Sequence, residues 1–185
     1  MYKKNTGKVK TKYLVMAAFL TAISIVLTRF LSVTLPILGG LPAIRVGFGK
    51  IPIVISGLLF GPMLGGITGV AADLIGMLIN PMGAYHPGFT ISSMLDGFLP
   101  GLFAIYFRNN PRLGQHFTFS RVFVVELVLA LLNSIILNTL WLSQILGKGY
   151  MLLLPARVIN AAVNLPIQAF IVFTIIKHVN KMVRD

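Results

Sequence analysis

Long apolar runs with very few acidic residues constrain the fold of this 185-residue chain more than any other feature. Hydrophobic residues make up 56% of the sequence and charged residues only 11%, whereas a soluble domain carries roughly 25% charged residues. A water-soluble globule of this size has no interior large enough to hide so much apolar surface. Cysteine is absent, which excludes a disulfide scaffold and a thiolate zinc site. We therefore predict a single all-α membrane domain embedded in a lipid bilayer.

Six apolar segments are candidate membrane-spanning helices, and together they predict a six-helix bundle in residues 13–180. They cover residues 13–30, 51–60, 63–79, 91–107, 122–146 and 154–176. The second segment is short or broken, because Gly61-Pro62 follows it and proline cannot continue a helical hydrogen-bond ladder. The first segment exceeds the usual apolar core of a signal peptide, so we interpret it as a retained helix.

The basic residues predict how the bundle lies in the membrane. The chain has 16 Lys plus Arg against 4 Asp plus Glu, a net charge of +12. Cytoplasmic segments attract Lys and Arg, and most of the basic residues lie in the tail 1–12, in the stretch 108–121 and at the C-terminal end. This predicts two cytoplasmic termini, with short tails at 1–12 and 181–185. Membrane orientation then explains the basic charge, and we expect no nucleic-acid partner.

Polar side chains within the spans gather in the half of the bundle predicted to face outward. Arg157, Asn160 and Asn164 share one helix face because they are three and four residues apart. Asn138 and Trp141 repeat that spacing on the preceding helix. A carboxylate at the centre of a span costs roughly 2.5–3.5 kcal/mol, so Asp73 and Asp96 are expected to face the interior or a cavity, whereas Glu126, close to Arg121, is expected to be interfacial or to face a partner.

Two connecting segments extend this polar end. Residues 31–50 form a long loop, which in a compact chain is usually functional or disordered, and residues 80–90 contain Tyr85, His86 and Phe89. We interpret the whole arrangement as a ligand pocket that opens outward. Plainer alternatives stay open: Trp141 and Tyr85 as interfacial belt residues, the asparagines as interhelical hydrogen-bond partners, and either aspartate as half of a structural ion pair.

Motifs of catalysis and metal binding are missing from the sequence. It has no G-x-x-x-x-G-K-[ST] motif for ATP hydrolysis, and neither H-E-x-x-H nor G-x-S-x-G. The three histidines lie on different segments and form no metal constellation. We expect no enzyme, no catalytic residue, no metal and no cofactor.

Small residues recur at the spacing that lets membrane helices approach closely. Gly57, Gly61, Gly65 and Gly69 form one series, and Gly97 and Gly101 repeat the spacing in the fourth span. Packing within the bundle is the plain interpretation for these glycines. The pair Ala18 and Ala22 also leaves open a smooth face that docks another protein.

An ordered series of short motifs resembles one family of membrane proteins. The motifs are Ala18-Phe-Leu-Thr-Ala22, Arg29-Phe-Leu-Ser32, Arg45-Val-Gly-Phe-Gly-Lys-Ile-Pro52, Gly57-Leu-Leu-Phe-Gly-Pro62, Asp73-Leu-Ile-Gly76 and Gly83-Ala-Tyr-His-Pro-Gly-Phe-Thr90. The series resembles the folate-specific S components, the substrate-binding subunits of energy-coupling factor (ECF) vitamin transporters. The likeness covers most of residues 13–180.

The resemblance implies a mechanism of transport. In the family, six helices bind a vitamin on the extracellular side of the plasma membrane, and loops corresponding to 31–50 and 80–90 act as gates. A transmembrane coupling subunit docks on the A-x-x-x-A face, here Ala18 and Ala22, and two cytosolic ATPase subunits supply the energy.

The chemistry of folate suits the outward polar residues. Its dianionic glutamate tail matches arginine, and the candidates are Arg29, Arg45 and Arg157. Its pterin edge donates hydrogen bonds to a carboxylate or an amide oxygen, and the candidates are Asp73, Asp96, Asn138, Asn160 and Asn164. Its rings match flat partners, here Trp141, Tyr85, Phe89 and His86. An S component for riboflavin, thiamine or pantothenate is the first alternative, and a stand-alone carrier or small membrane enzyme is the second.

Overall fold

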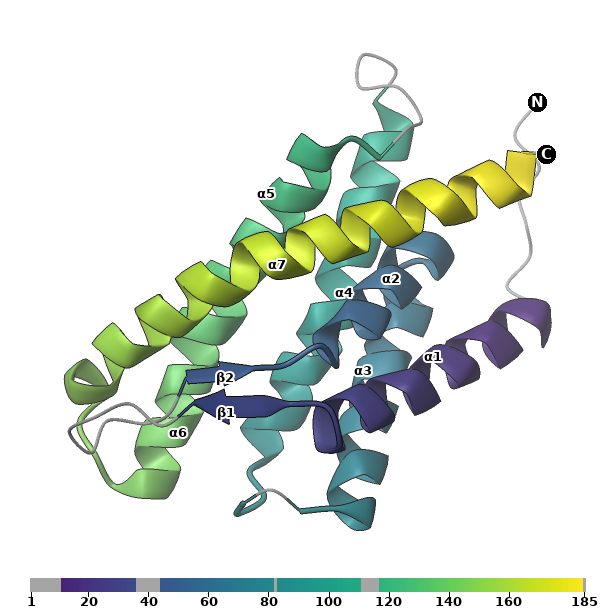
Figure 1. The fold of residues 1–185 in the computed structure, drawn as a ribbon. Helices are drawn as coiled ribbons and strands as arrows, with labels where there is room; N and C mark the ends of the chain where they lie inside the picture. Colours follow the sequence, from purple (N-terminus) through teal and green to yellow (C-terminus); the bar gives the residue numbers. More distant parts are fainter. Residues whose placement is uncertain (1–10, 36–43, 82, 111–116, 185) are drawn as a thin grey trace.

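The computed structural model describes residues 11–35, 44–81, 83–110 and 117–184, with side chains described for all of these except 33–35, 44–46 and 180–184. Almost all of the predicted tail 1–12 lies outside the described residues. Helices dominate what is described (Figure 1): α1 (Thr11–Arg29), α2 (Lys50–Phe60), α3 (Pro62–Ile79), α4 (Pro87–Asn109), α5 (Phe119–Leu129), η2 (Ala130–Leu137), α6 (Asn138–Leu146) and α7 (Tyr150–Arg184).

Five helical segments are long and apolar enough to cross a membrane. They are α1, α3, α4, α7 and the continuous segment Phe119–Leu146, in which α5 and α6 flank the π-helical stretch η2. The remaining helix, α2, has 11 residues and is short, as the Gly61-Pro62 punctuation predicts. At 1.5 Å per residue it spans roughly 16 Å, about half of the hydrocarbon core.

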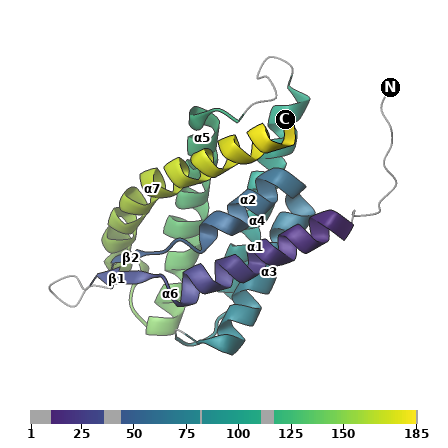
Figure 2. The same ribbon diagram turned by 45° about the vertical axis from the view of Figure 1, so that its right-hand side comes forward.

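A two-stranded hairpin interrupts the all-helical pattern within the segment 31–50. Strands β1 (Val33–Leu35) and β2 (Ile44–Val46) are antiparallel, and Thr34 lies opposite Arg45. The prediction of an all-α chain with a plain loop here needs this correction. Both strands are rich in β-branched residues, which favour extended backbone. Strand β2 packs against α7, and the hairpin lies towards the start of that helix in both views (Figures 1 and 2).

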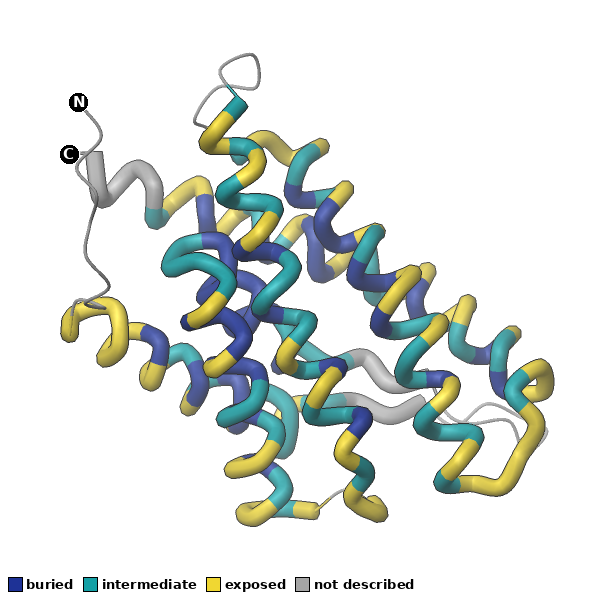
Figure 3. Tube along the Cα trace, turned by 180° about the vertical axis from the view of Figure 1, so that it is seen from behind, coloured by how far each residue is buried: buried dark blue, intermediate teal, exposed yellow. Residues whose placement is uncertain are grey.

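The short helix α2 occupies the centre of the bundle. Every residue from Ile51 to Leu58 is buried, and α2 contacts α1, α3, α4 and α7. Its side chains join those of α5 and α7 in the main apolar core, where Val54, Val125 and Val172 are completely buried. Exposed residues lie along the outer surfaces of the helices (Figure 3), and many of them are large and apolar, which suits a surface covered by lipid.

Glycines allow α2, α3 and α4 to cross at backbone contact. A Cβ atom added to Gly57 would lie 2.1 Å from the carbonyl oxygen of Gly97, and one added to Gly65 would lie 2.3 Å from the same atom. A Cβ on Gly97 itself would lie 1.9 Å from the carbonyl oxygen of Gly65. The predicted packing role is therefore confirmed for Gly57, Gly65, Gly69, Gly97 and Gly101, whereas Gly61 has open space beside it and a positive φ of 94° between α2 and α3.

Candidate functional site

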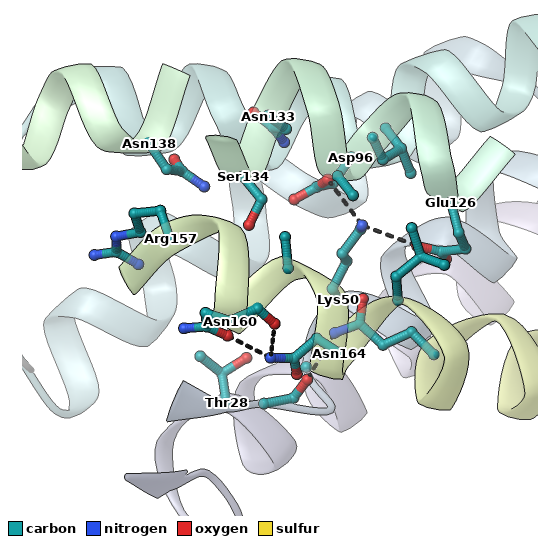
Figure 4. Close-up of a pocket in the computed structure, with 17 residues that line it drawn as sticks. Thr28, Lys50, Asp96, Glu126, Asn133, Ser134, Asn138, Arg157, Asn160 and Asn164 are labelled. Atoms are coloured by element: carbon teal, nitrogen blue, oxygen red, sulfur yellow. Dashed lines mark hydrogen bonds and ion pairs between the residues drawn. The ribbon is translucent and has the colours of Figure 1, made fainter. Parts of the chain in front are cut away.

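A polar cavity of about 280 Å³ lies between α2, α4, α5–η2–α6 and α7, next to the hairpin. Five of the predicted site residues line it: Asp96, Asn138, Arg157, Asn160 and Asn164. The sequence analysis did not single out several other polar residues of the lining as ligand contacts: Thr28, Lys50, Glu126, Asn133, Ser134 and Gln168. Figure 4 shows these groups arranged along the length of the cavity.

One end of the cavity holds an ion-paired lysine between two carboxylates. The Lys50 Nζ atom lies 2.9 Å from Glu126 Oε2 and 3.8 Å from Asp96 Oδ1. Glu126 is 1% exposed, so the expectation that it is interfacial or faces a partner is wrong. Its partner is Lys50 at the start of α2 rather than the nearby Arg121, because Glu126 lies on the inner face of α5.

Four residues that line this cavity have a side-chain acceptor oxygen without a hydrogen-bond partner. Asp96 Oδ1, Glu126 Oε1, Asn133 Oδ1 and Asn138 Oδ1 are buried and have no hydrogen-bond partner in the described structure. The orientation of the Asn133 amide is fixed, because its Nδ2 donates to the Ser92 carbonyl oxygen at 2.6 Å. Buried acceptors without partners are costly. The cavity is therefore suited to a ligand that presents several N–H donors.

The other end of the cavity carries Arg157. Its guanidinium lies beside Asn138, away from the carboxylates of Asp96 and Glu126 (Figure 4). Two turns along α7, the Asn164 side chain donates to the side-chain oxygen and the backbone carbonyl of Asn160. The cavity is thus polarised along its length, with acidic and acceptor groups at one end and a guanidinium at the other.

The π-helical stretch explains how residues so far apart on one helix reach the same cavity. Glu126, Ala130, Ser134 and Asn138 are four residues apart and all line it. In a regular α-helix each four-residue step rotates a side chain by about 40° past a full turn. The wider turns of η2 (Ala130–Leu137) counter this drift. Such insertions are frequent at functional sites.

An aromatic cluster stands next to the cavity at the start of α4. The rings of His86 and Trp141 stack at 5.3 Å between centroids, and Phe89 meets the His86 ring edge-on at 6.3 Å. Ser92 joins this cluster to the cavity: Trp141 Nε1 donates to its Oγ at 3.3 Å, and Asn133 donates to its carbonyl oxygen. Three predicted ring partners thus lie together, and Ser92 connects them to Asn133 in the cavity lining.

The remaining predicted residues lie elsewhere. Arg29 Nη1 donates to the Asn80 carbonyl oxygen at 3.0 Å, at the end of α3. Asp73 accepts from Thr90 Oγ1 at 2.7 Å, and Tyr85 is hydrogen-bonded to that same threonine at 3.3 Å. None of these three lines the cavity; they tie the 80–90 connection to α1, α3 and α4. The side chain of Arg45 lies outside the described residues.

Side chains from three helices hold the end of the hairpin against the cavity. Ser24 Oγ donates to the Gly49 carbonyl oxygen at 2.6 Å, and Gln168 Nε2 donates to the Gly47 carbonyl oxygen at 3.1 Å. Lys50 follows directly and is held by its two carboxylates. Gln168 and Lys50, which both line the cavity, are thus part of the attachment of the hairpin base.

Two further expectations concern a metal site and a docking face. Among the described residues, no group of three His, Asp or Glu side chains is placed to hold a metal ion. Ala18 and Ala22 are both exposed on α1, whereas Ala17, Thr21, Ser24 and Ile25 form its buried face. The alanine pair thus lies on the outer surface of the bundle.

The fold and the cavity define a small helical membrane protein with a polar cavity between its helices. A family model described as "ECF-type riboflavin transporter, S component" matches residues 8–180. The chain belongs to this family, the S components of ECF-type transporters, and the family predicted from the motif series is confirmed. The family is one of transporter subunits rather than enzymes, and the chain is a multi-pass protein of the cell membrane.

Relatives and solved structures agree with this assignment. The chain is 36% identical to the folate transporter FolT of Clostridium novyi (strain NT) over 173 residues, 94% of this chain and 92% of the relative. It is 26% identical to FolT of Leuconostoc mesenteroides over 176 residues, 92% of this chain and 88% of the relative.

A crystal structure of FolT bound with folic acid superposes with a TM-score of 0.71 at 30% identity, covering 88% of this chain and 93% of that one. The S component for biotin from an ECF-type transporter, at 21% identity, has a TM-score of 0.69 over 98% of this chain and 95% of that one, and shares the fold.

Proposed function

We propose that the chain is a folate-specific S component, which binds folate and delivers it across the membrane in an ATP-driven ECF transporter. Two relatives that match most of the chain are folate transporters, and the solved FolT with which it shares 30% identity binds folic acid. A transmembrane coupling subunit and two ATPase subunits complete the proposed transporter.

The polarity of the cavity along its length carries this proposal. Folate has a donor-rich pterin head, with an amino group and a ring N–H, and a dianionic glutamate tail. The pterin matches the end with Asp96 and Glu126, each of which has one oxygen without a hydrogen-bond partner that can accept from such donors. The tail matches Arg157, which binds carboxylates in a bidentate fashion. A volume of about 280 Å³ is near the lower end for ligand pockets, so it suits the head, with the tail at the mouth.

Riboflavin is the substrate named by the matching family model, and the cavity suits it less well. Its isoalloxazine edge has one ring N–H between two carbonyl oxygens, and it carries no carboxylate. With this ring edge against Asp96 and Glu126, riboflavin would offer a single N–H to their unsatisfied oxygens and would place carbonyl oxygens against carboxylates. Unpaired polar groups of this kind are what allow a site to reject a near-analogue.

Calorimetric titration of the purified chain with folate, riboflavin and pteroate tests the assignment, because pteroate is folate without its glutamate. We expect one-to-one binding of folate and no heat with riboflavin. Arg157→Gln should weaken folate binding by at least about tenfold, from the loss of a charged hydrogen bond, and weaken pteroate binding less, because pteroate keeps only the benzoate carboxylate in place of the two glutamate carboxylates. Lys148→Gln, which removes an exposed charge, is the matched control.

Two outcomes contradict the assignment in different ways. Binding of riboflavin but not folate discards the substrate and keeps the family. Equal losses for folate and pteroate in Arg157→Gln would mean that Arg157 maintains the shape of the cavity and does not bind the tail.

The proposed membrane arrangement follows the sequence prediction: six crossings in residues 13–180, cytoplasmic tails at 1–12 and 181–185, and gates at 31–50 and 80–90. The positions of the hairpin and of the 80–90 connection support it, because both lie towards the cavity end of the bundle (Figure 1). The start of α1 and the end of α7 lie towards the other end.

The coupling subunit is proposed to dock on the exposed face of α1 that contains Ala18 and Ala22. Ala18→Leu should leave folate binding unchanged and abolish uptake in liposomes that contain the complete transporter, because a larger side chain separates the two helices. Ala162→Leu, at an exposed alanine of α7, should retain uptake. Uptake by the chain alone would instead indicate a stand-alone carrier.

A further inference from the structure

A second hollow, of about 580 Å³, lies at the opposite end of the bundle from the polar cavity. It is formed where α1 and α5 begin and where α2 and α4 end. None of its lining residues lines the polar cavity. The proposed binding of folate in the polar cavity therefore does not account for this hollow.

The lining of this hollow combines an aromatic wall with two guanidinium groups. Tyr13 stacks on Phe60 with 5.6 Å between ring centroids. The Arg121 Cζ atom lies 5.7 Å from the centroid of the Phe107 ring, and Arg108 is exposed on the last turn of α4. Among the described residues, the lining contains no carboxylate. The hollow is therefore positively charged at one side and apolar at the other.

The combination of guanidinium groups and an aromatic wall matches one component of the surrounding bilayer. Guanidinium groups bind phosphate in a bidentate geometry, and a guanidinium stacked on a ring keeps its in-plane N–H groups available for such contacts. Basic pockets between the ends of membrane helices bind anionic lipid headgroups. A free anion would use the arginines and leave the aromatic wall uncovered, whereas a neutral apolar segment would cover the wall and make no use of the guanidinium groups.

We propose that this hollow is a binding site for one anionic phospholipid. The phosphate lies between the side chains of Arg108 and Arg121, and an acyl chain covers Phe60 and Phe107. The lipid joins the end of α4 to the start of α5, which no described ion pair connects. The proposal is independent of which vitamin the polar cavity binds.

Native mass spectrometry of the detergent-purified full chain tests the proposal, with phosphatidylglycerol, phosphatidylcholine and glycerol phosphate as separate probes. We expect one retained phosphatidylglycerol, no retained phosphatidylcholine and no retained glycerol phosphate. Arg108→Gln/Arg121→Gln should lower the affinity for phosphatidylglycerol about thirtyfold, given the usual contribution of each basic residue. Lys148→Gln/Lys177→Gln removes the same charge from exposed positions and should bind like the unchanged chain. Folate titration of each variant shows that it is folded.

Three results overturn the proposal. Equal retention of phosphatidylglycerol and phosphatidylcholine would mean an unselective lipid surface. Binding of glycerol phosphate as tight as that of the lipid would mean an anion site. Retention of phosphatidylglycerol that the arginine substitutions do not affect would assign the hollow to another occupant. If no phosphatidylglycerol is retained and the same substitutions abolish uptake by the complete transporter, that occupant is the coupling subunit.

Discussion

Lys50→Met is expected to lower the free energy of unfolding by about 3–5 kcal/mol, the usual cost of removing one partner from a buried ion pair. The Lys50 ammonium lies between Glu126 and Asp96, at 2.9 and 3.8 Å. Without it, two carboxylates face each other in a closed part of the bundle. The base of the hairpin also loses a contact, so folate binding should weaken as well. Thermal unfolding of the ligand-free protein in detergent measures the first effect, and calorimetry measures the second.

A second substitution separates charge from packing. In the unchanged chain, Glu126→Gln should destabilise, because it removes the closest partner of Lys50. In the Lys50→Met background the same change should stabilise, because it removes one of two facing carboxylates. A stability change of the same sign in both backgrounds would show that electrostatic pairing is not what Lys50 contributes. Asn133→Ala, in the cavity but outside the ion pairs, is expected to have the same sign in both.

The helical framework was predictable because the bilayer leaves few choices for an apolar chain. Backbone groups in lipid must be satisfied within the segment, so a long apolar run becomes a helix. The third segment, predicted at 63–79, corresponds closely to α3 (Pro62–Ile79). The hairpin was not predictable in the same way. Its two strands contain only three residues each, and their pairing spans a separation that no local pattern reveals.

Most of the predicted residues that line the cavity share a helix, and Asp96 was predicted from the cost of a carboxylate within a span. Asn160 and Asn164 are one turn apart on α7, and their spacing in the sequence is enough to indicate a common face. Lys50 and Glu126 are 76 residues apart in the sequence, and only the fold brings them together. A signal did exist: each is a lone charge beside or within an apolar run, and a charge in such a place needs an opposite partner.

Arg29 and Asp73 show the opposite failure, in which a correct placement near one end of the bundle was not enough. Both lie at the end predicted for the pocket, yet their side chains point to the connection between α3 and α4. The Arg29 guanidinium donates to the carbonyl oxygen of Asn80. The C-terminal end of a helix favours such a positive charge because its carbonyl groups carry partial negative charge. Membrane depth can be derived from sequence, but the direction of a side chain around its helix depends on packing.

Gly97→Ala is expected to destabilise by about 3 kcal/mol, at the upper end of the usual cost of overpacking. The added Cβ atom would lie 1.9 Å from the carbonyl oxygen of Gly65 and 3.0 Å from its Cα atom. Both contacts are with backbone, which no side-chain rotation relieves, so α3 and α4 must move apart. Because α2 crosses α4 at the same residue, its contact with Gly57 is strained too. Thermal unfolding in detergent, with the yield of folded protein, measures the loss.

Gly66→Ala is the matched control, since it adds the same methyl group on the facing helix α3. Its nearest neighbour would be Met94 Cγ at 3.5 Å, an ordinary contact with a flexible side chain. Alanine is also favoured over glycine in a helix by up to about 1 kcal/mol, so this variant should be neutral or slightly more stable. Equal losses from the two substitutions would mean that added volume anywhere on these helices is harmful. A loss of stability in Gly97→Ala alone would show that the backbone contact allowed by glycine determines how α3 and α4 pack. The position of Asp96, the neighbour of Gly97 on α4, would then depend on that contact.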